Sequence, residues 1–145
     1  MIRRRRERGQ SLVEFALVIP VFLLILMGVV DFGMAIYKFN GVSQAAREIA
    51  RVTSVHPCAG TTPCAPGSSA ETAAVIQVQK GLIPGLANPT FRCVDSAGQP
   101  VAPNPCNFAQ DSVEVTVTAP YRPVTPILGS LVTWTMKGIS SAQLQ

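Results

Sequence analysis

The feature that most constrains the fold is an apolar segment close to the N-terminus. Residues 11–30 read SLVEFALVIPVFLLILMGVV, and Glu14 is the one charged residue among these twenty. At a helical rise of about 1.5 Å per residue, the segment is about 30 Å long, which is the thickness of the hydrocarbon core of a bilayer. The sequence therefore predicts a single membrane-spanning helix.

Basic residues are gathered in front of this segment. Residues 1–9 carry five arginines and one glutamate, which together account for the formal net charge of +4 of the whole chain. Because basic residues stay on the cytoplasmic side of a membrane, we expect a cytoplasmic N-terminus and an extracytoplasmic body beyond residue 31. Residues 10–145 carry seven basic and seven acidic residues, so the chain after its first nine residues has no net charge. A nucleic-acid-binding surface needs basic residues spread over a folded face, so none is expected.

Three interpretations of the N-terminal segment compete. A cleaved secretory signal peptide fits the basic start, but the apolar run is longer than usual and residues 31–35, DFGMA, make a poor small-residue cleavage site. An ordinary uncleaved signal anchor fits both the length and the charge. The third interpretation, a prepilin-type signal, also accounts for Glu14.

Glu14 is costly in a membrane helix, by about 2.5 to 3.5 kcal/mol at mid-span on insertion scales. It lies five residues after Gly9. If the chain is cut between Gly9 and Gln10, the new α-amine of Gln10 is a cation that can pair with Glu14 of a neighbouring subunit and offset both desolvation costs. The simpler alternative is that Glu14 snorkels toward the arginines at the cytoplasmic interface.

Residues 9–20, GQSLVEFALVIP, resemble the opening of the TadE-like family, minor pilin-like proteins of the tight-adherence (Tad, or Flp) pilus assembly system. The short basic leader that ends in Gly9 and the pair Glu14-Phe15 are similar to the signal of type IV prepilins. The resemblance continues through the sequence DFG at residues 31–33 and the small-residue run at 44–51.

This resemblance implies cleavage by a prepilin peptidase at a processing site formed by Gly9 and Gln10, and an assembly or recognition role for Glu14 and Phe15. Many type IV pilins have an aromatic residue or methionine where this chain has Gln10. That departure puts N-methylation of the mature terminus in doubt more than it does cleavage.

The helical pattern continues beyond the apolar segment. Apolar residues recur there at steps of three or four along one helix face. They are Phe32, Ile36, Phe39, Val42, Ala46, Ile49 and Val52. We therefore expect one helix over residues 10–54, transmembrane at about 11–30 and amphipathic at 31–54, with Pro20 as a helix kink.

Residues 55–145 are expected to form an extracytoplasmic head domain. Ser68 and Glu71 are spaced as a capping box, with Ser68 as the N-cap of a helix at about 69–80. The residues expected to face inward on this helix are Ala70, Ala74, Val75 and Val78. Alternating apolar residues predict short strands at 90–95, 112–119 and about 130–141.

The predicted fold class is therefore α+β and pilin-like. A long N-terminal membrane-spanning helix is followed by a small head with one short helix and an antiparallel sheet of about three strands. Hydrophobic residues make up 48% of the chain and charged residues 14%, which excludes an intrinsically disordered protein.

The four cysteines all lie in the predicted head: Cys58, Cys64, Cys93 and Cys106. An even number in an exported domain suggests two disulfides. The favoured pairs are Cys58–Cys64 and Cys93–Cys106, because each closes a local loop. A zinc site using His56 and the first two cysteines is disfavoured, since the Cys-x5-Cys spacing is wider than that of zinc knuckles. No metal and no cofactor are expected.

No catalytic constellation is recognisable, and the acids of the head are isolated, so we do not expect an enzyme or a small-molecule substrate. The expected partners are the membrane, a prepilin peptidase and other Tad pilus or pseudopilin subunits. The expected location is the inner or cytoplasmic membrane in a single pass, or a pilus. One alternative is an uncleaved single-pass protein whose head is a binding module. A major filament subunit is another, but such Flp-type subunits are generally far shorter.

Overall fold

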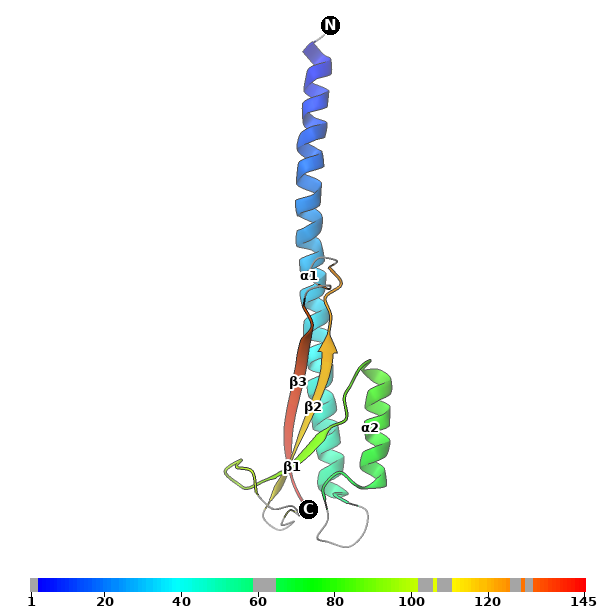
Figure 1. The fold of residues 1–145 in the computed structure, drawn as a ribbon, viewed down its shortest axis with the longest axis vertical. Coiled ribbons are helices and arrows are strands. Elements are labelled where there is room, and N and C mark those ends of the chain that lie inside the picture. Colours follow the sequence, from blue (N-terminus) through cyan, green and yellow to red (C-terminus); the bar gives the residue numbers. More distant parts are fainter. Residues whose placement is uncertain (1–2, 59–64, 102–105, 107–110, 126–128, 130–131) are drawn as a thin grey trace.

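The computed structural model describes residues 3–58, 65–101, 106, 111–125, 129 and 132–145. Its longest element is α1, a helix over Arg3–Val55. Fifty-three residues make this helix about 80 Å long. It begins before the predicted start at residue 10 and runs through Pro20 without a break. The N-terminal half projects alone, and the rest of the chain is gathered around the C-terminal half (Figure 1).

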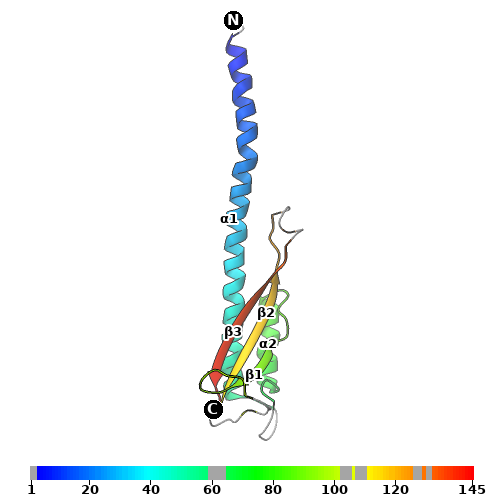
Figure 2. The same cartoon turned by 60° about the vertical axis from the view of Figure 1, so that its left-hand side comes forward.

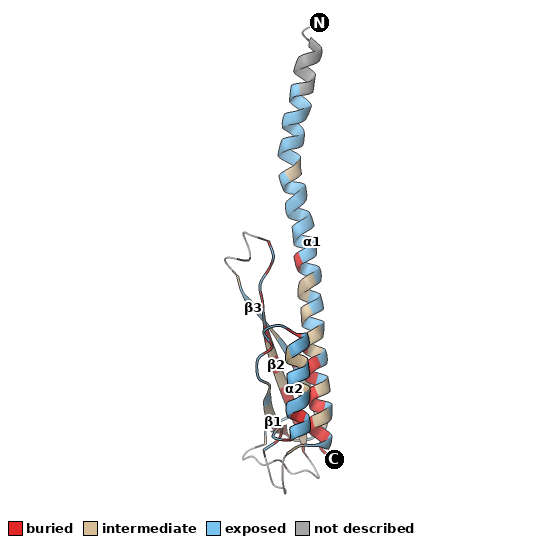
Figure 3. Ribbon diagram, turned by 90° about the vertical axis from the view of Figure 1, so that its right-hand side faces the viewer, coloured by how far each residue is buried: buried red, intermediate tan, exposed pale blue. Residues whose placement is uncertain are grey.

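A three-stranded antiparallel sheet forms the body of the head. Its strands are β1 (Thr90–Val94), β2 (Ser112–Tyr121) and β3 (Trp134–Gln143), in the spatial order β1-β2-β3. A second helix, α2 (Ala70–Leu82), lies beside α1. Both helices cover one face of the sheet, and the opposite face is open (Figures 2 and 3). The predicted α+β class, with one long helix, one short helix and three antiparallel strands, is confirmed.

The core lies between α1 and the inner face of β2. Alternate residues of β2 point inward, as the sequence predicted, and Val113, Val115 and Val117 are fully buried. They meet a stripe of mostly small residues on α1: Val42, Ala45, Ala46, Ile49 and Ala50. All the deeply buried apolar residues of α1 lie in its C-terminal half (Figure 3).

The expected core face of α1 was partly wrong. Val42, Ala46 and Ile49 are buried, but Phe32, Ile36 and Phe39 are respectively 70%, 46% and 48% exposed. The buried stripe also passes through the small residues Ala45 and Ala50, in a part of α1 where the sheet lies close to the helix backbone.

Gly138 on β3 shows how close this approach is. A Cβ atom there would lie 2.7 Å from the carbonyl oxygen of Val42 and 3.1 Å from the Cα atom of Ser43. Both are backbone atoms, which cannot move aside as a side chain can. A residue without a side chain is therefore required where β3 crosses α1.

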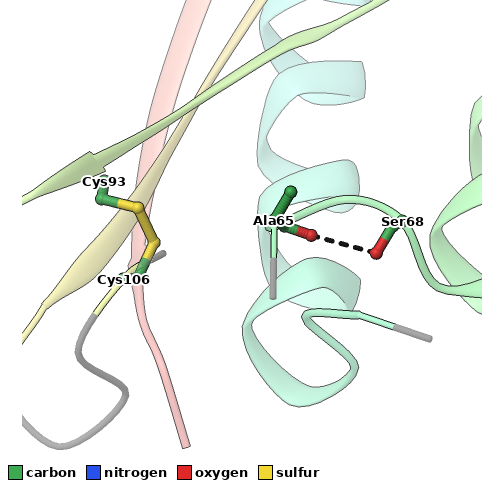
Figure 4. Close-up of a disulfide and its surroundings, with 4 residues drawn as sticks. All are labelled: Ala65, Ser68, Cys93 and Cys106. Atoms are coloured by element: carbon green, nitrogen blue, oxygen red, sulfur yellow. Dashed lines mark hydrogen bonds between the residues drawn. A yellow bond between two sulfur atoms is a disulfide. The ribbon is translucent and has the colours of Figure 1, made fainter. Parts of the chain in front are cut away.

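The start of α2 lies one residue later than predicted. Its N-cap is Ser69, whose side chain accepts a hydrogen bond from the Thr72 amide at 3.1 Å, so the predicted capping box headed by Ser68 is wrong. The Ser68 hydroxyl instead donates to the Ala65 carbonyl (Figure 4). Ser69 is favoured as the N-cap because its hydroxyl also donates to the Thr72 hydroxyl. The Thr72 hydroxyl in turn lies 3.2 Å from the hydroxyl of Thr53 on α1.

The buried face of α2 also differs from the expected one. Of the four residues expected to face inward, Val75 is half-buried, whereas Ala70, Ala74 and Val78 are exposed. The inward face runs instead through Thr72, Val75, Ile76 and Gln79 to Ile83, just beyond the helix.

A disulfide joins Cys93 on β1 to Cys106, one of the two favoured pairs, with 5.4 Å between the Cα atoms (Figure 4). Closing a loop of this length stabilises a fold by about 3 kcal/mol in the chain-entropy account. Cys58 is also disulfide-bonded. Its expected partner, Cys64, lies outside the described residues.

Candidate membrane-anchoring and assembly site

The predicted processing site lies on the exposed N-terminal part of α1. Gly9 has open space around it, and Gln10 is exposed one residue further on. Because the helix is continuous from Arg3 onward, the Gly9–Gln10 peptide bond lies within helical backbone. A peptidase that cuts this bond has to unwind the helix locally, and a glycine lowers the cost of doing so.

Glu14 is exposed one turn after Gln10. The side-chain amide of Gln10 donates a hydrogen bond to the Oε1 atom of Glu14 at 3.3 Å. The donor is neutral, and the contact is long for a hydrogen bond. Phe15, the second residue of the predicted recognition pair, is 63% exposed. Both side chains are therefore presented to the surroundings of the helix.

The segment that follows has the properties of a membrane span. Among the described residues, α1 is the one helix long and apolar enough to cross a bilayer, with a mean hydropathy of 2.7 in its most apolar window, and none of that window is buried. Its leucines, valines and phenylalanines are 45 to 71% exposed between residues 12 and 30, Ile25 is 61% exposed, and Ile19 is half-buried. Such a surface needs an apolar environment supplied from outside the chain.

Asp31, the first residue after the apolar segment, ties α1 to the head. Its carboxylate accepts hydrogen bonds from the amides of Val124 at 2.7 Å and Thr125 at 3.1 Å, and from the Thr125 hydroxyl. Its backbone carbonyl accepts a 2.7 Å hydrogen bond from the hydroxyl of Tyr121. The end of β2 and the residues after it are thereby held against α1 at the boundary of the apolar segment.

The charge on Asp31 suits this arrangement. The hydrogen bond from the Thr125 hydroxyl lowers the pKa of the Asp31 carboxyl below its ordinary value of 3.8; burial opposes this shift, and the Val124 and Thr125 amides add to it. Burial raises the pKa of the Tyr121 phenol, and the nearby Asp31 carboxylate raises it further. Asp31 is therefore a charged acceptor and Tyr121 a neutral donor at neutral pH.

Lys38 makes a second link two turns further along α1. Its ammonium group donates to the carbonyl oxygens of Pro84, which follows α2, at 3.1 Å and of Pro120, near the end of β2, at 2.6 Å. Neither proline has an amide hydrogen, and their carbonyls point outward from the backbone to the lysine. Asp31 and Lys38 together fix the head along α1.

An open groove of about 1320 Å³ lies beside this link, between α1 and the end of α2. Its lining is mixed and includes exposed aromatic, basic and amide side chains. Within it, Glu48 and Arg51 form a 2.9 Å ion pair on α1. The described residues contain no group of three or more histidine, cysteine, aspartate or glutamate side chains able to hold a metal ion.

The role of Asp31 was not predicted from the sequence, in which this residue marks only the boundary of the span and the start of the DFG motif. Its partners lie ninety or more residues away in the chain. The available signal was the acid itself, because a carboxylate at the edge of an apolar segment needs donors.

Comparison with known families bears on this N-terminal half. A family model described as TadE-like protein matches residues 9–51, which confirms the resemblance predicted from the sequence. The match covers the candidate processing site, the apolar segment, Asp31 and most of the part of α1 that packs on the head. It suggests a component related to the Tad pilus. Searches among curated proteins and among solved structures gave no match.

Proposed function

We propose that this chain, which carries the TadE-like sequence over residues 9–51, is a minor pilin or pseudopilin of Tad pilus assembly. In this proposal residues 1–9 are a leader that a prepilin peptidase removes, residues 10–54 anchor the protein in the inner or cytoplasmic membrane, and residues 55–145 form an extracytoplasmic head. The role is structural: the chain is a substrate of the peptidase and a partner of other Tad subunits.

The observation that carries the proposal is the matched motif on an exposed helix. Glu14 lies in the apolar segment and accepts a hydrogen bond of 3.3 Å from the Gln10 side-chain amide, a weak neutral contact for a carboxylate. Cleavage after Gly9 would create an α-amine on Gln10, and the amine of an adjacent subunit would give Glu14 a charged partner. A charge-assisted hydrogen bond of this kind is about twice as strong as a neutral one.

The first test is the mature N-terminus. We would measure the intact mass and N-terminal sequence of the protein from membranes with and without the prepilin peptidase. The proposal expects a chain that starts at Gln10 only when the peptidase is present. A chain that keeps its arginines under both conditions would identify an uncleaved signal-anchored protein and overturn the proposal.

The second test concerns the charge of Glu14. Glu14→Ala and Glu14→Gln should both leave the protein in the membrane and cleaved, and both should impair pilus assembly, because neither side chain carries the negative charge that an ion pair with the amine needs. Glu48→Gln, which removes a carboxylate from the head half of α1, is the matched control and should assemble normally. Normal pili from the two Glu14 variants would show that this carboxylate has no assembly role.

A further inference from the structure

Exposed aromatic and apolar side chains gather where the head meets the apolar half of α1. Phe32 and Tyr37 on α1 are 70% and 82% exposed, and Val124 and Trp134 on the head are 65% and 51% exposed. Trp134 begins β3 and stacks on Tyr121, with the ring centroids 6.3 Å apart. These four exposed residues, Phe32, Tyr37, Val124 and Trp134, are called the collar below.

The hydrogen bonds of Asp31 fix the level of the collar along α1. The Val124 amide is bonded to the Asp31 carboxylate, and the Tyr121 hydroxyl to the Asp31 carbonyl. Trp134 is the strand partner of Tyr121 in the β2–β3 register. Val124 therefore lies at the first residue after the apolar segment, and Trp134 is tied to the same residue through its pairing with Tyr121. Neither can move along α1 while these bonds hold.

This level coincides with the edge of a bilayer if residues 11–30 span it. Tryptophan and tyrosine are enriched at that edge, because their rings are apolar but carry a polar atom that remains hydrated. Arg122, which is exposed between Tyr121 and Val124, is placed to reach lipid phosphates, as arginine side chains near a membrane surface do. The collar is thus continuous with the apolar surface of the span.

We propose that the end of the head is seated in the outer headgroup region of the membrane, with Val124 and Trp134 in contact with lipid. Asp31 holds this end of the head against the helix, so the head stands at a fixed height on the bilayer. The inference rests on the membrane-anchored state of the proposed function. It adds a second, peripheral membrane contact made by a part of the chain far from the span in sequence.

Trp134 reports on this contact directly, since it is the single tryptophan of the chain. The full-length protein would be reconstituted into vesicles of phosphatidylcholine and phosphatidylglycerol containing lipids brominated at shallow or deep acyl positions. We expect shallow bromines to quench Trp134 several-fold more than deep ones, and vesicles to shield it from aqueous acrylamide. Equal exposure to acrylamide in vesicles and in the unfolded chain, without quenching by bromolipid, would overturn the inference.

The matched control moves the tryptophan along β3. In the double variant Trp134→Phe, Ile139→Trp, the new ring replaces a side chain that is 53% exposed, close to the exposure of Trp134. Five strand residues separate the two sites by about 17 Å. This tryptophan should be quenched by acrylamide and insensitive to bromolipids. The variant Val124→Asp, which keeps the backbone amide bonded to Asp31, should reduce the bromolipid quenching of Trp134.

Other outcomes separate this inference from the proposed function. Protein that fails to float with vesicles after an alkaline wash has no membrane anchor, and both proposals fail. Protein that floats while Trp134 remains unquenched by lipid retains its anchor and overturns the collar contact alone. Shielding of Trp134 that depends on the protein-to-lipid ratio, without bromolipid quenching, would assign the collar to a second copy of the chain and likewise overturn it.

Discussion

The two halves of α1 differ in the size and in the exposure of their apolar side chains. The half before Asp31 is built from large apolar residues that are exposed, whereas the half after it buries small ones, among them Ala45, Ala46 and Ala50. Large side chains give a helix the most apolar surface for contact with lipid. Small ones let a sheet approach the helix backbone, as Gly138 does at Val42. One continuous helix is therefore a candidate membrane span at one end and a core element at the other.

The two acids of the helix differ in the same way. Asp31 is buried, and its carboxylate receives three hydrogen bonds from the head of its own chain. Glu14 is exposed and has the contact with the Gln10 amide. Asp31 thus serves the fold of the protomer, and Glu14 is available for the proposed pairing between protomers.

The largest contrast should come from removing one isoleucine from each half. Ile49 is fully buried against the sheet, and Ile25 is 61% exposed. Ile49→Ala should lower the free energy of unfolding of the head by about 2 to 5 kcal/mol, since it leaves a cavity in the core. Ile25→Ala should leave that free energy unchanged. Urea unfolding of the full-length protein in detergent micelles, followed by near-ultraviolet circular dichroism, measures both, and equal effects would contradict the division of the helix.

A somewhat smaller contrast is expected from adding a methyl group. Gly138→Ala forces β3 away from the backbone of α1 and should cost about 1 to 3 kcal/mol of unfolding free energy, as overpacking does. Gly28→Ala is its counterpart in the apolar half, where a Cβ atom meets nothing within 4 Å. That variant should be neutral in the same unfolding experiment. A fully stable Gly138→Ala protein would show that β3 can move away from the Val42 carbonyl far enough to admit a Cβ atom without cost.

The N-cap of α2 offers a test of about 1 kcal/mol. Ser69→Ala removes the acceptor of the Thr72 amide and should destabilise the head by about that amount. Ser68→Ala, one residue earlier, removes a hydroxyl that serves the Ala65 carbonyl on the exposed surface and should cost less. If Ser68→Ala destabilised the head more than Ser69→Ala, Ser68 would be the N-cap, as the sequence predicted.

The parts of the fold that could be predicted from the sequence are those that depend on residues close together in the chain. The long helix and the inward valines of β2 were predicted because charge, hydropathy and alternation are local patterns. The buried face of α1 was predicted in part, since Phe32 and Phe39 are more hydrophobic than the alanines that the sheet in fact covers. Size alone does not reveal that a strand will cross within a few ångströms of the helix backbone.

The candidate site divides in the same manner. Gly9, Gln10, Glu14 and Phe15 were recognised from a contiguous motif, and the family match covers all four. The donors of Asp31 were not predicted, because they are separated from it by more than ninety residues of chain. The packing of β2 on α1 has to be known before the contact can be inferred.

The subtlest effect expected is the response of the Asp31 contact to acid. Because hydrogen bonding, above all from the Thr125 hydroxyl, lowers the pKa of Asp31 in the folded protein, its stabilising contribution is complete above the ordinary value of 3.8 and is lost as the pH falls through the lowered pKa. The amide resonances of Val124 and Thr125, recorded in micelles, should therefore shift with a midpoint below 3.8. Asp31→Asn should abolish the shift. A midpoint at or above 3.8 would mean that the carboxylate gains nothing from these donors, and the head would then be held along α1 by the Lys38 link and the core, with its end free to leave the membrane edge.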